Sequence, residues 1–312
     1  MSLQFNEISL SEWNGLAEEK RLSGLFYQSE FHAIISSAYH KTCTYFAVKD
    51  DANVLIALPI YHKQKDASLI THFFYQVIYF DKNLSERKKI EAFNFLATSL
   101  IEKFNKIDLK LDPEIFDIRA FVWNGFENNT YYSYHINTAS ELNYSENIKR
   151  QLKKSYQSYK VELSTKWNDE VIGIQLGDME KNGLSQKESS QVRHWLKSCS
   201  EQNLLDLFIL KNNNDEVVGS AVYLRSLTFA YLIAVMSEQS SQAMLYDKAI
   251  EHYKQNNVLD LDLLGANLPN IAIYKSQFDS KLISYHIVSY RRNKTWELIK
   301  KTIKSKIKSI YK

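Results

Sequence analysis

The sequence LFILKNNNDEVVGSAVYLRSLTFAYLIAV, residues 207–235, holds three apolar runs joined by short polar links. The first link, Asn212-Asn213-Asn214-Asp215, consists of residues that favour turns. Runs rich in β-branched and aromatic residues predict strands, and short links predict that neighbouring strands are antiparallel. A helix from about Ser241 and a strand at 259–263 are expected to complete the unit. The three predicted strands are 207–211, 217–224 and 227–235.

The first part of the chain shows the same order of elements. Three strand-like runs come before a long amphipathic helix that starts at Ser85 and a strand at 107–111. A strand at 5–8 and two helices, one capped by Ser11 and one starting at Ser29, precede them. Because the order repeats, the sequence predicts an α/β protein of α+β mixed sheets in two tandem domains, 1–140 and 141–312. The three runs are 44–49, 54–61 and 69–80.

The composition is that of a globular protein. At 312 residues the chain exceeds one comfortable hydrophobic core, and 45% hydrophobic with 24% charged residues excludes disordered and fibrous classes. No run reaches the ~18 apolar residues of a membrane span, and no secretory leader is recognisable, so we expect a cytoplasmic location. Cys43 and Cys199 lie far apart, and the histidines show no ligand spacing. We therefore expect no metal site, reduced thiols and structural histidines.

Basic residues gather in two predicted helices. The helix at 146–159 has an apolar stripe with Lys149, Arg150, Lys153 and Lys154 beside it, and the helix at 295–311 carries five lysines beside a narrow apolar stripe. The formal net charge of +3 is too small to indicate nucleic-acid binding by itself, so no DNA partner is expected. The C-terminal helix fits docking on the core, peripheral contact with a membrane surface, or contact with phosphates.

Several short stretches stand out, spread over nearly the whole chain. They are FYQSEF at 26–31, ALPI at 57–60, FVWNGF at 121–126, YSY at 132–134 with the helix from Asn147, DLLG at 262–265 and YKSQF at 274–278. In their order and spacing these stretches resemble the FemAB-like branch of the GNAT acyltransferase superfamily, and the resemblance implies two tandem GNAT-like units. Asp279 stands where that branch carries glycine.

The resemblance implies a GNAT-type N-acyltransferase that moves an acyl or aminoacyl group to an amine acceptor. In that frame Lys275 would stabilise the oxyanion of the tetrahedral intermediate, and Asp262 or Glu238 would accept a proton from the amine. Tyr274, Gly265 and Arg225 would contact the substrate, Arg225 by gripping a phosphate or carboxylate. A plainer interpretation also stands for the charged residues: solvated lysine and arginine, and carboxylates in ion pairs at strand ends.

The donor stays open between acyl-CoA and aminoacyl-tRNA, neither held as a permanent cofactor. A bound diphosphate needs free backbone amides at a helix N-terminus, where Gln239, Ser240 and Ser241 are the candidates, but the segment 237–242 contains no glycine. An aminoacyl-tRNA needs a basic surface, which the two basic helices would supply. The amine acceptor would be an envelope precursor or a small metabolite. The alternative function is a catalytically silent GNAT-fold binding or scaffold protein.

Overall fold

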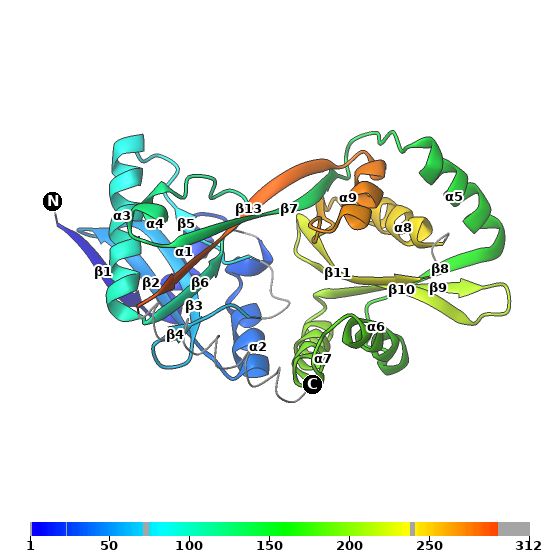
Figure 1. Ribbon diagram of the computed structural model, residues 1–312, viewed down its shortest axis with the longest axis horizontal. Coiled ribbons are helices and arrows are strands. Elements are labelled where there is room, and N and C mark those ends of the chain that lie inside the picture. Colours follow the sequence, from blue (N-terminus) through cyan, green and yellow to red (C-terminus); the bar gives the residue numbers. More distant parts are fainter. Residues whose placement is uncertain (1, 23, 71–74, 238–240, 293–312) are drawn as a thin grey trace, which may run out of the picture. The chain divides into compact units, whose positions relative to one another are not determined.

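The computed structural model describes residues 2–22, 24–70, 75–237 and 241–292 (Figure 1). The described chain forms two compact units, and neither is one continuous segment. The predicted boundary at residue 140 lies inside the second unit, because two long strands each run from one unit into the other and the early helices belong to the second. Unit 1 comprises residues 2–9, 42–129 and 286–292, and unit 2 comprises 10–41 and 130–285.

Unit 1 contains an antiparallel sheet of order β1-β2-β3-β5 and a second group in which β6 pairs with β4 on one side and β13 on the other. Helix α3 begins after Ser85, whose hydroxyl accepts from Lys88 N at 3.3 Å, and buries Phe93, Leu96 and Leu100 in the core. The elements are β1 (Leu3–Ile8), β2 (Thr42–Asp50), β3 (Asn53–His62), β4 (Asp66–Ala67), β5 (Tyr79–Phe80), α3 (Glu86–Lys103), β6 (Lys106–Lys110), α4 (Arg119–Trp123) and β13 (Lys281–Arg291).

Two expectations for the N-terminal part are wrong. The run 69–80 is not one long strand, since only β5 is a named strand among its described residues, although Tyr75, Val77 and Ile78 are buried. An apolar run indicates that residues are buried but does not by itself indicate a strand. These residues are buried in irregular chain rather than in a sheet. Ser11 is not an N-cap either, because helix α1 (Leu10–Glu19) already begins before it.

Unit 2 is built on a sheet of order β7-β12-β11-β10-β9-β8. Figure 1 shows α8 and α9 on one side of strands β9 to β11 and α6 and α7 on the other. Helix α2 packs on α7, which ties residues 29–39 to this unit. The elements are α1, η1 (Leu25–Tyr27), α2 (Ser29–Tyr39), β7 (Glu127–Asn137), α5 (Glu146–Ser158), β8 (Tyr159–Ser164), α6 (Asp169–Lys181), α7 (Gln186–Glu201), β9 (Leu205–Asn212), β10 (Val217–Arg225), β11 (Phe229–Ser237), α8 (Gln242–Gln255), β12 (Asp260–Asp262), α9 (Pro269–Lys275) and η2 (Ser276–Phe278).

The predicted meander 207–235 is confirmed as β9, β10 and β11, which pair antiparallel in sequence order. Strand β12 then pairs with β11 in parallel and with β7 antiparallel. It therefore lies between β11, which is close in the sequence, and β7, which comes more than a hundred residues earlier. Among the described residues no helix is long and apolar enough to cross a membrane. The predicted helix at 295–311 lies outside the described residues.

Candidate functional site

Strands β11 and β12 separate after a short parallel pairing. Their register runs from Phe229↔Asp260 to Tyr231↔Asp262, where β12 ends, whereas β11 continues to Ser237. Within the described chain, residues 232–237 of β11 therefore have no strand partner on the β12 side. Residues 233–237 are half-buried rather than covered. The two strands form a fork, and Asp262 lies where they part.

Asp262 is fully buried at this fork and is surrounded by polar groups of unit 2. Its Oδ1 accepts hydrogen bonds from the Ser133 hydroxyl and from Leu264 N, the latter at 2.8 Å. Its Oδ2 lies 3.0 Å from His135 Nε2. Ser133 and His135 lie two residues apart on β7, so both side chains point to the same face as Asp262. A buried carboxylate is thus compensated by partners from a neighbouring strand and from its own loop.

His135 connects this buried carboxylate to the surface. Its side chain is 22% exposed, and its ring meets the Phe229 ring edge-on at a centroid distance of 5.3 Å. Phe229 stacks on Tyr231, which in turn contacts Phe26 of η1. The pair His135–Asp262 lies at ion-pair distance, but the N–H is not aligned well enough for a hydrogen bond. Only a change in ring orientation separates this arrangement from a hydrogen-bonded pair.

Lys275 is buried at the end of α9, and its ammonium group donates to three backbone carbonyls of the chain that follows β12. The acceptors are Leu263 O at 2.7 Å, Leu264 O, and Gly265 O at 3.2 Å. Leu264 and Gly265 both have positive φ, 46° and 55°, which turns successive carbonyls toward one point. Burial lowers the pKa of Lys275 to about 8, against the opposing charge of Asp262. This lysine is neither solvated nor directed at open space.

The aromatic residues of the predicted motif at 274–278 pack beneath the same loop. Tyr274 and Phe278 both contact the Tyr246 ring of α8. The hydroxyl of Tyr274 is buried without a hydrogen-bond partner in the described chain, as is that of Tyr223. Asp279 has a φ of 55°, so the turn keeps the left-handed backbone that glycine adopts readily, and its Oδ2 accepts from Asn143 N at 3.0 Å.

Arg225 lies on the opposite face of the sheet from Asp262. It pairs in register with Ala230, which pairs with Leu261, whereas Tyr231 pairs with Asp262. Its Nε is 3.0 Å from the carboxylate of Asp206, a fully buried residue that also accepts from the Tyr253 hydroxyl at 3.1 Å. Arg225 therefore already grips a carboxylate, and that carboxylate belongs to the protein.

The loop before α8 is only partly described. Ser241 is buried and occupies the N-cap position of α8. The other candidates of that loop, Glu238, Gln239 and Ser240, lie outside the described residues. The fork thus brings together Asp262, Gly265 and Lys275 with two residues that the sequence analysis did not single out, Ser133 and His135. A signal for them was available in the sequence, because the alternation along residues 131–136 is typical of a strand and would place positions 133 and 135 on one face.

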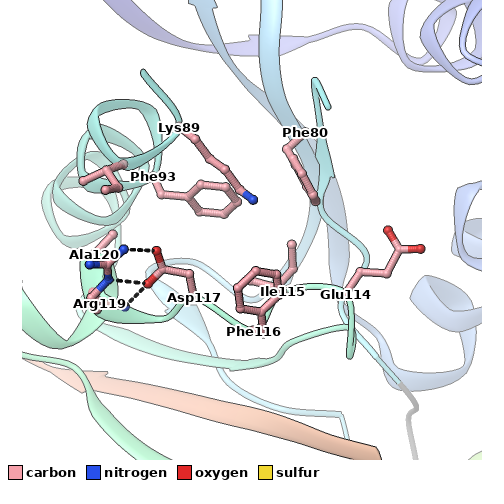
Figure 2. Close-up of a pocket in the computed structure, with 10 residues that line it drawn as sticks. Phe80, Lys89, Phe93, Glu114, Ile115, Phe116, Asp117, Arg119 and Ala120 are labelled. Atoms are coloured by element: carbon pink, nitrogen blue, oxygen red, sulfur yellow. Dashed lines mark hydrogen bonds and ion pairs between the residues drawn. The ribbon is translucent and has the colours of Figure 1, made fainter. Parts of the chain in front are cut away.

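Unit 1 contains a pocket of about 360 Å³, open space included, lined by residues of β5, α3 and the 114–120 segment. Figure 2 shows that Arg119 at its rim is bonded to Asp117, which lowers the pKa of that carboxyl group. Lys89 Nζ lies 4.6 Å from the centre of the Phe80 ring. No side chain lining this pocket has a buried polar atom without a partner. In the described chain no three His, Cys, Asp or Glu side chains form a metal site.

Comparison of the whole chain with solved structures identifies this fold. The structure of FemX superposes with a TM-score of 0.62 at 11% identity, covering 95% of this chain and 99% of FemX. A tandem GNAT protein from the clavulanic acid biosynthesis pathway gives a TM-score of 0.53 at 9% identity, covering 91% and 98%. The chain has the tandem GNAT fold. The fold predicted from the FemAB-like resemblance is confirmed.

The structure of L-PGS from Bacillus licheniformis is also similar, with a TM-score of 0.51 at 10% identity over 94% of this chain and 95% of that one. No family model matches the sequence, and no curated protein matches it either. At identities near one residue in ten, the tandem GNAT fold is what these comparisons establish. What the site does has to be argued from its own chemistry.

Proposed function

We propose that this protein transfers an acyl or aminoacyl group from an activated carrier to an amine acceptor. The observation that carries the proposal is the fork between β11 and β12, with the buried Asp262 and the partly exposed His135 where the strands part. Transfer to an amine needs a place for the carrier, a way to remove a proton from nitrogen and a means of stabilising the oxyanion. The fork offers a candidate for each.

The free edge of β11 is the proposed site for the acyl carrier. Beyond Tyr231 no described strand pairs with β11 on the β12 side, and an extended chain placed there can bond to its backbone as a further strand would. In this proposal Gly265 and Tyr274 line the substrate side of the loop, and Ser241 with its two preceding neighbours, Gln239 and Ser240, receives the polar end of the donor. Arg225 contributes by holding Asp206 under the sheet.

The donor class remains a choice between acyl-CoA and aminoacyl-tRNA. Helix α5 exposes Lys149, Arg150, Lys153 and Lys154, as its amphipathic pattern predicts, and such a surface would favour a phosphate backbone. The amine acceptor is proposed to be an envelope precursor or a small metabolite. Peripheral membrane contact would fall to the basic segment 295–311, which lies outside the described residues.

The experiment compares binding and transfer for both donors. Purified protein is titrated with acetyl-CoA and with a mixed aminoacyl-tRNA pool, and the melting temperature is followed, because a ligand that binds only the folded state raises it. The same donors, radiolabelled on the acyl group, are then incubated with a panel of primary amines. A shift with one donor and label in an amide product are expected. If neither donor gives a shift in melting temperature or a labelled amide product, the proposal is wrong.

One observation favours the second candidate, a silent binding protein. All three N–H groups of the Lys275 ammonium donate to backbone carbonyls of the protein. Lys275 can therefore donate to an oxyanion only if one of these hydrogen bonds breaks. Donor binding without transfer in the unmodified protein supports the silent scaffold. If the unmodified protein is active, Lys275→Ala should lose most of its transfer while it keeps donor binding and its fold by circular dichroism, which supports the role of Lys275 in stabilising the oxyanion.

A further inference from the structure

We infer that His135 is the proton acceptor of the transfer reaction, with Asp262 as the buried group that orients it. This inference rests on the proposed function and assigns a residue to one step of it. It starts from an arrangement that differs from a solvent-exposed ion pair. The carboxylate of Asp262 has no exposed surface, and it faces an imidazole whose side chain is 22% exposed. Such a pair joins a buried charge to the side from which a substrate approaches.

The partners of Asp262 determine which imidazole nitrogen is available. Oδ1 is occupied by Ser133 and Leu264 N, so Oδ2 is the oxygen that faces His135. A carboxylate accepts protons, and therefore Nε2 carries the hydrogen and Nδ1 keeps its lone pair. No hydrogen bond joins Nδ1 to any described residue, and Nε2 is the ring nitrogen that is buried without a bonded partner. The free lone pair is thus on the more open side of the ring.

The surroundings favour this role over a purely structural one. The ring is held edge-on against Phe229, and Phe229 stacks on Tyr231, so an aromatic wall limits the orientations of His135. Tyr231 is also the last residue of β11 that pairs with β12, which places the wall at the fork itself. The charge of Asp262 also acts on two titratable groups, Lys275 of α9 and Tyr285 of β13.

The present misalignment of Nε2 with Oδ2 suits a resting site. Hydrogen bonds between catalytic groups are often long or poorly directed without substrate and become well aligned in the complex. Here the two atoms are already 3.0 Å apart, so reorientation of the ring suffices. Asp262 is fixed by two other donors and does not have to move.

The chemical step balances with an acyl donor of the ester or thioester class. The lone pair of the acceptor nitrogen attacks the carbonyl carbon and forms the C–N bond. The C–O or C–S bond to the carrier breaks, and its electron pair leaves with the oxygen or sulfur. The proton lost from nitrogen goes to His135 Nδ1, and from there to the leaving group or to water. Asp262 stabilises the imidazolium that exists between these two transfers and is not itself protonated.

The first test needs no substrate. Protein labelled with ¹⁵N at histidine is measured by multiple-bond ¹H–¹⁵N NMR above neutral pH, and His135→Gln identifies the signal of His135. The tautomer with the hydrogen on Nε2 is expected in the unmodified protein, and Asp262→Asn should redistribute the tautomers. A hydrogen on Nδ1 in the unmodified protein would overturn the inference, whatever the substrate.

The second test uses the donor and amine for which the unmodified protein shows transfer. His135→Gln is expected to lower kcat by about 10²–10⁴-fold with little change in KM for the donor, the usual contribution of a general base. It should also remove the acidic limb of the pH profile, and exogenous imidazole should partly rescue His135→Ala. The matched control is His252→Gln, because His252 also packs against aromatic rings in unit 2 but lies on α8. It should retain full activity.

The outcomes separate the inference from the function on which it rests. If the unmodified protein transfers no acyl group, the proposed function is wrong and the role of His135 falls with it. If the unmodified protein is active and His135→Gln is equally active, the function stands and the inference is refuted. If His135→Gln loses activity without a change in the pH profile and without imidazole rescue, His135 is structural and the inference is refuted as well.

Discussion

Lys275 is buried, and its ammonium group donates hydrogen bonds to three backbone carbonyls. A single ammonium satisfies oxygens of three consecutive residues only because Leu264 and Gly265 both adopt positive φ. For a leucine that backbone costs about 1–2 kcal/mol. The hydrogen bonds of Lys275 therefore keep the loop that follows β12 in a backbone conformation that is unfavourable for Leu264.

Replacing Lys275 with methionine removes the charge and the donors but keeps the length of the side chain. One buried and two partly buried carbonyls lose their partner, so the free energy of unfolding should fall by about 2–4 kcal/mol. Chemical denaturation followed by circular dichroism measures it. Lys281→Met, at an exposed position of β13, is the control and should change little. Equal stability of the two variants would show that Lys275 does not hold the loop.

The same variant predicts a pH dependence. The pKa of Lys275 is about 8 in the folded protein and near its ordinary 10.5 in the unfolded chain. Between these values the unfolded chain binds the extra proton, so raising the pH favours the folded state. The stability of the unmodified protein relative to Lys275→Met should therefore rise by at most about 3 kcal/mol from pH 8 to 10.5. A flat or falling difference would contradict the lowered pKa.

In unit 2 the partly exposed Arg225 pairs with the fully buried Asp206. Removing Arg225 leaves the carboxylate of Asp206 with the Tyr253 hydroxyl, so Arg225→Ala should cost about 3 kcal/mol. The double variant with Asp206→Asn should cost less than the sum of the single changes, and a double-mutant cycle measures that coupling. Arg87→Ala, from an exposed pair with Glu91, should change stability by less than about 0.5 kcal/mol. Additive effects at Arg225 and Asp206 would refute the pairing.

At the scale of elements, Gly219 fixes the approach of β10 to β11. A Cβ placed there would lie 2.5 Å from Ser237 Cβ and 2.8 Å from Met236 O, so the strands would have to move apart. Gly219→Ala should destabilise the protein by about 1–3 kcal/mol. Gly177→Ala in α6 is the matched control, since nothing lies within 4 Å of its added Cβ, and it should stabilise slightly. Thermal denaturation distinguishes the two, and equal melting temperatures would be the contrary result.

Elements with strong local signals could be predicted from the sequence, and those defined by distant partners could not. Helices α3 and α5 follow from a capping serine and an apolar stripe, and β9 to β11 from their polar link. Helices α6 and α7 went unpredicted although Asn168 caps the first and Ser185 with Glu188 forms a capping box at the second. The buried residues of α7, such as Val192, Trp195 and Cys199, recur at helical spacing, so both the caps and the period of these helices were present in the sequence.

The candidate site was predictable to the same extent. Asp262, Gly265 and Lys275 are consecutive or close in the chain, and the resemblance pointed to them. Ser133 and His135 lie beside Asp262 because β12 pairs with β7. This pairing spans more than a hundred residues of sequence, and no local pattern shows it. Histidines without ligand spacing were interpreted as structural, and that rule overlooks a histidine whose partner is a single distant carboxylate.

At the scale of the whole molecule, the two units are interlaced along the chain. A fragment of residues 141–312 contains β12 but lacks β7, which pairs with Asp260, Leu261 and Asp262, and it lacks α2, which packs on α7. We expect this fragment to be unfolded or aggregated by circular dichroism and gel filtration. Adding the segment 1–140 in trans should restore structure if the missing strand and helix are the cause. A stable, cooperatively melting fragment would show that the tandem domains are independent.

The interlaced course of the chain also decides when folding can begin during synthesis. Helix α2 can pack only after α7, about 150 residues later, has been synthesised. A ribosome that adds about 5–20 residues per second needs roughly 10–30 s to synthesise this stretch. Strand β6 waits longer still for β13, whose pairing residues end at Arg291. The nascent polypeptide therefore exposes apolar surface for most of its translation. Its yield in a cell should depend on the supply of chaperones more than its folded stability alone would suggest.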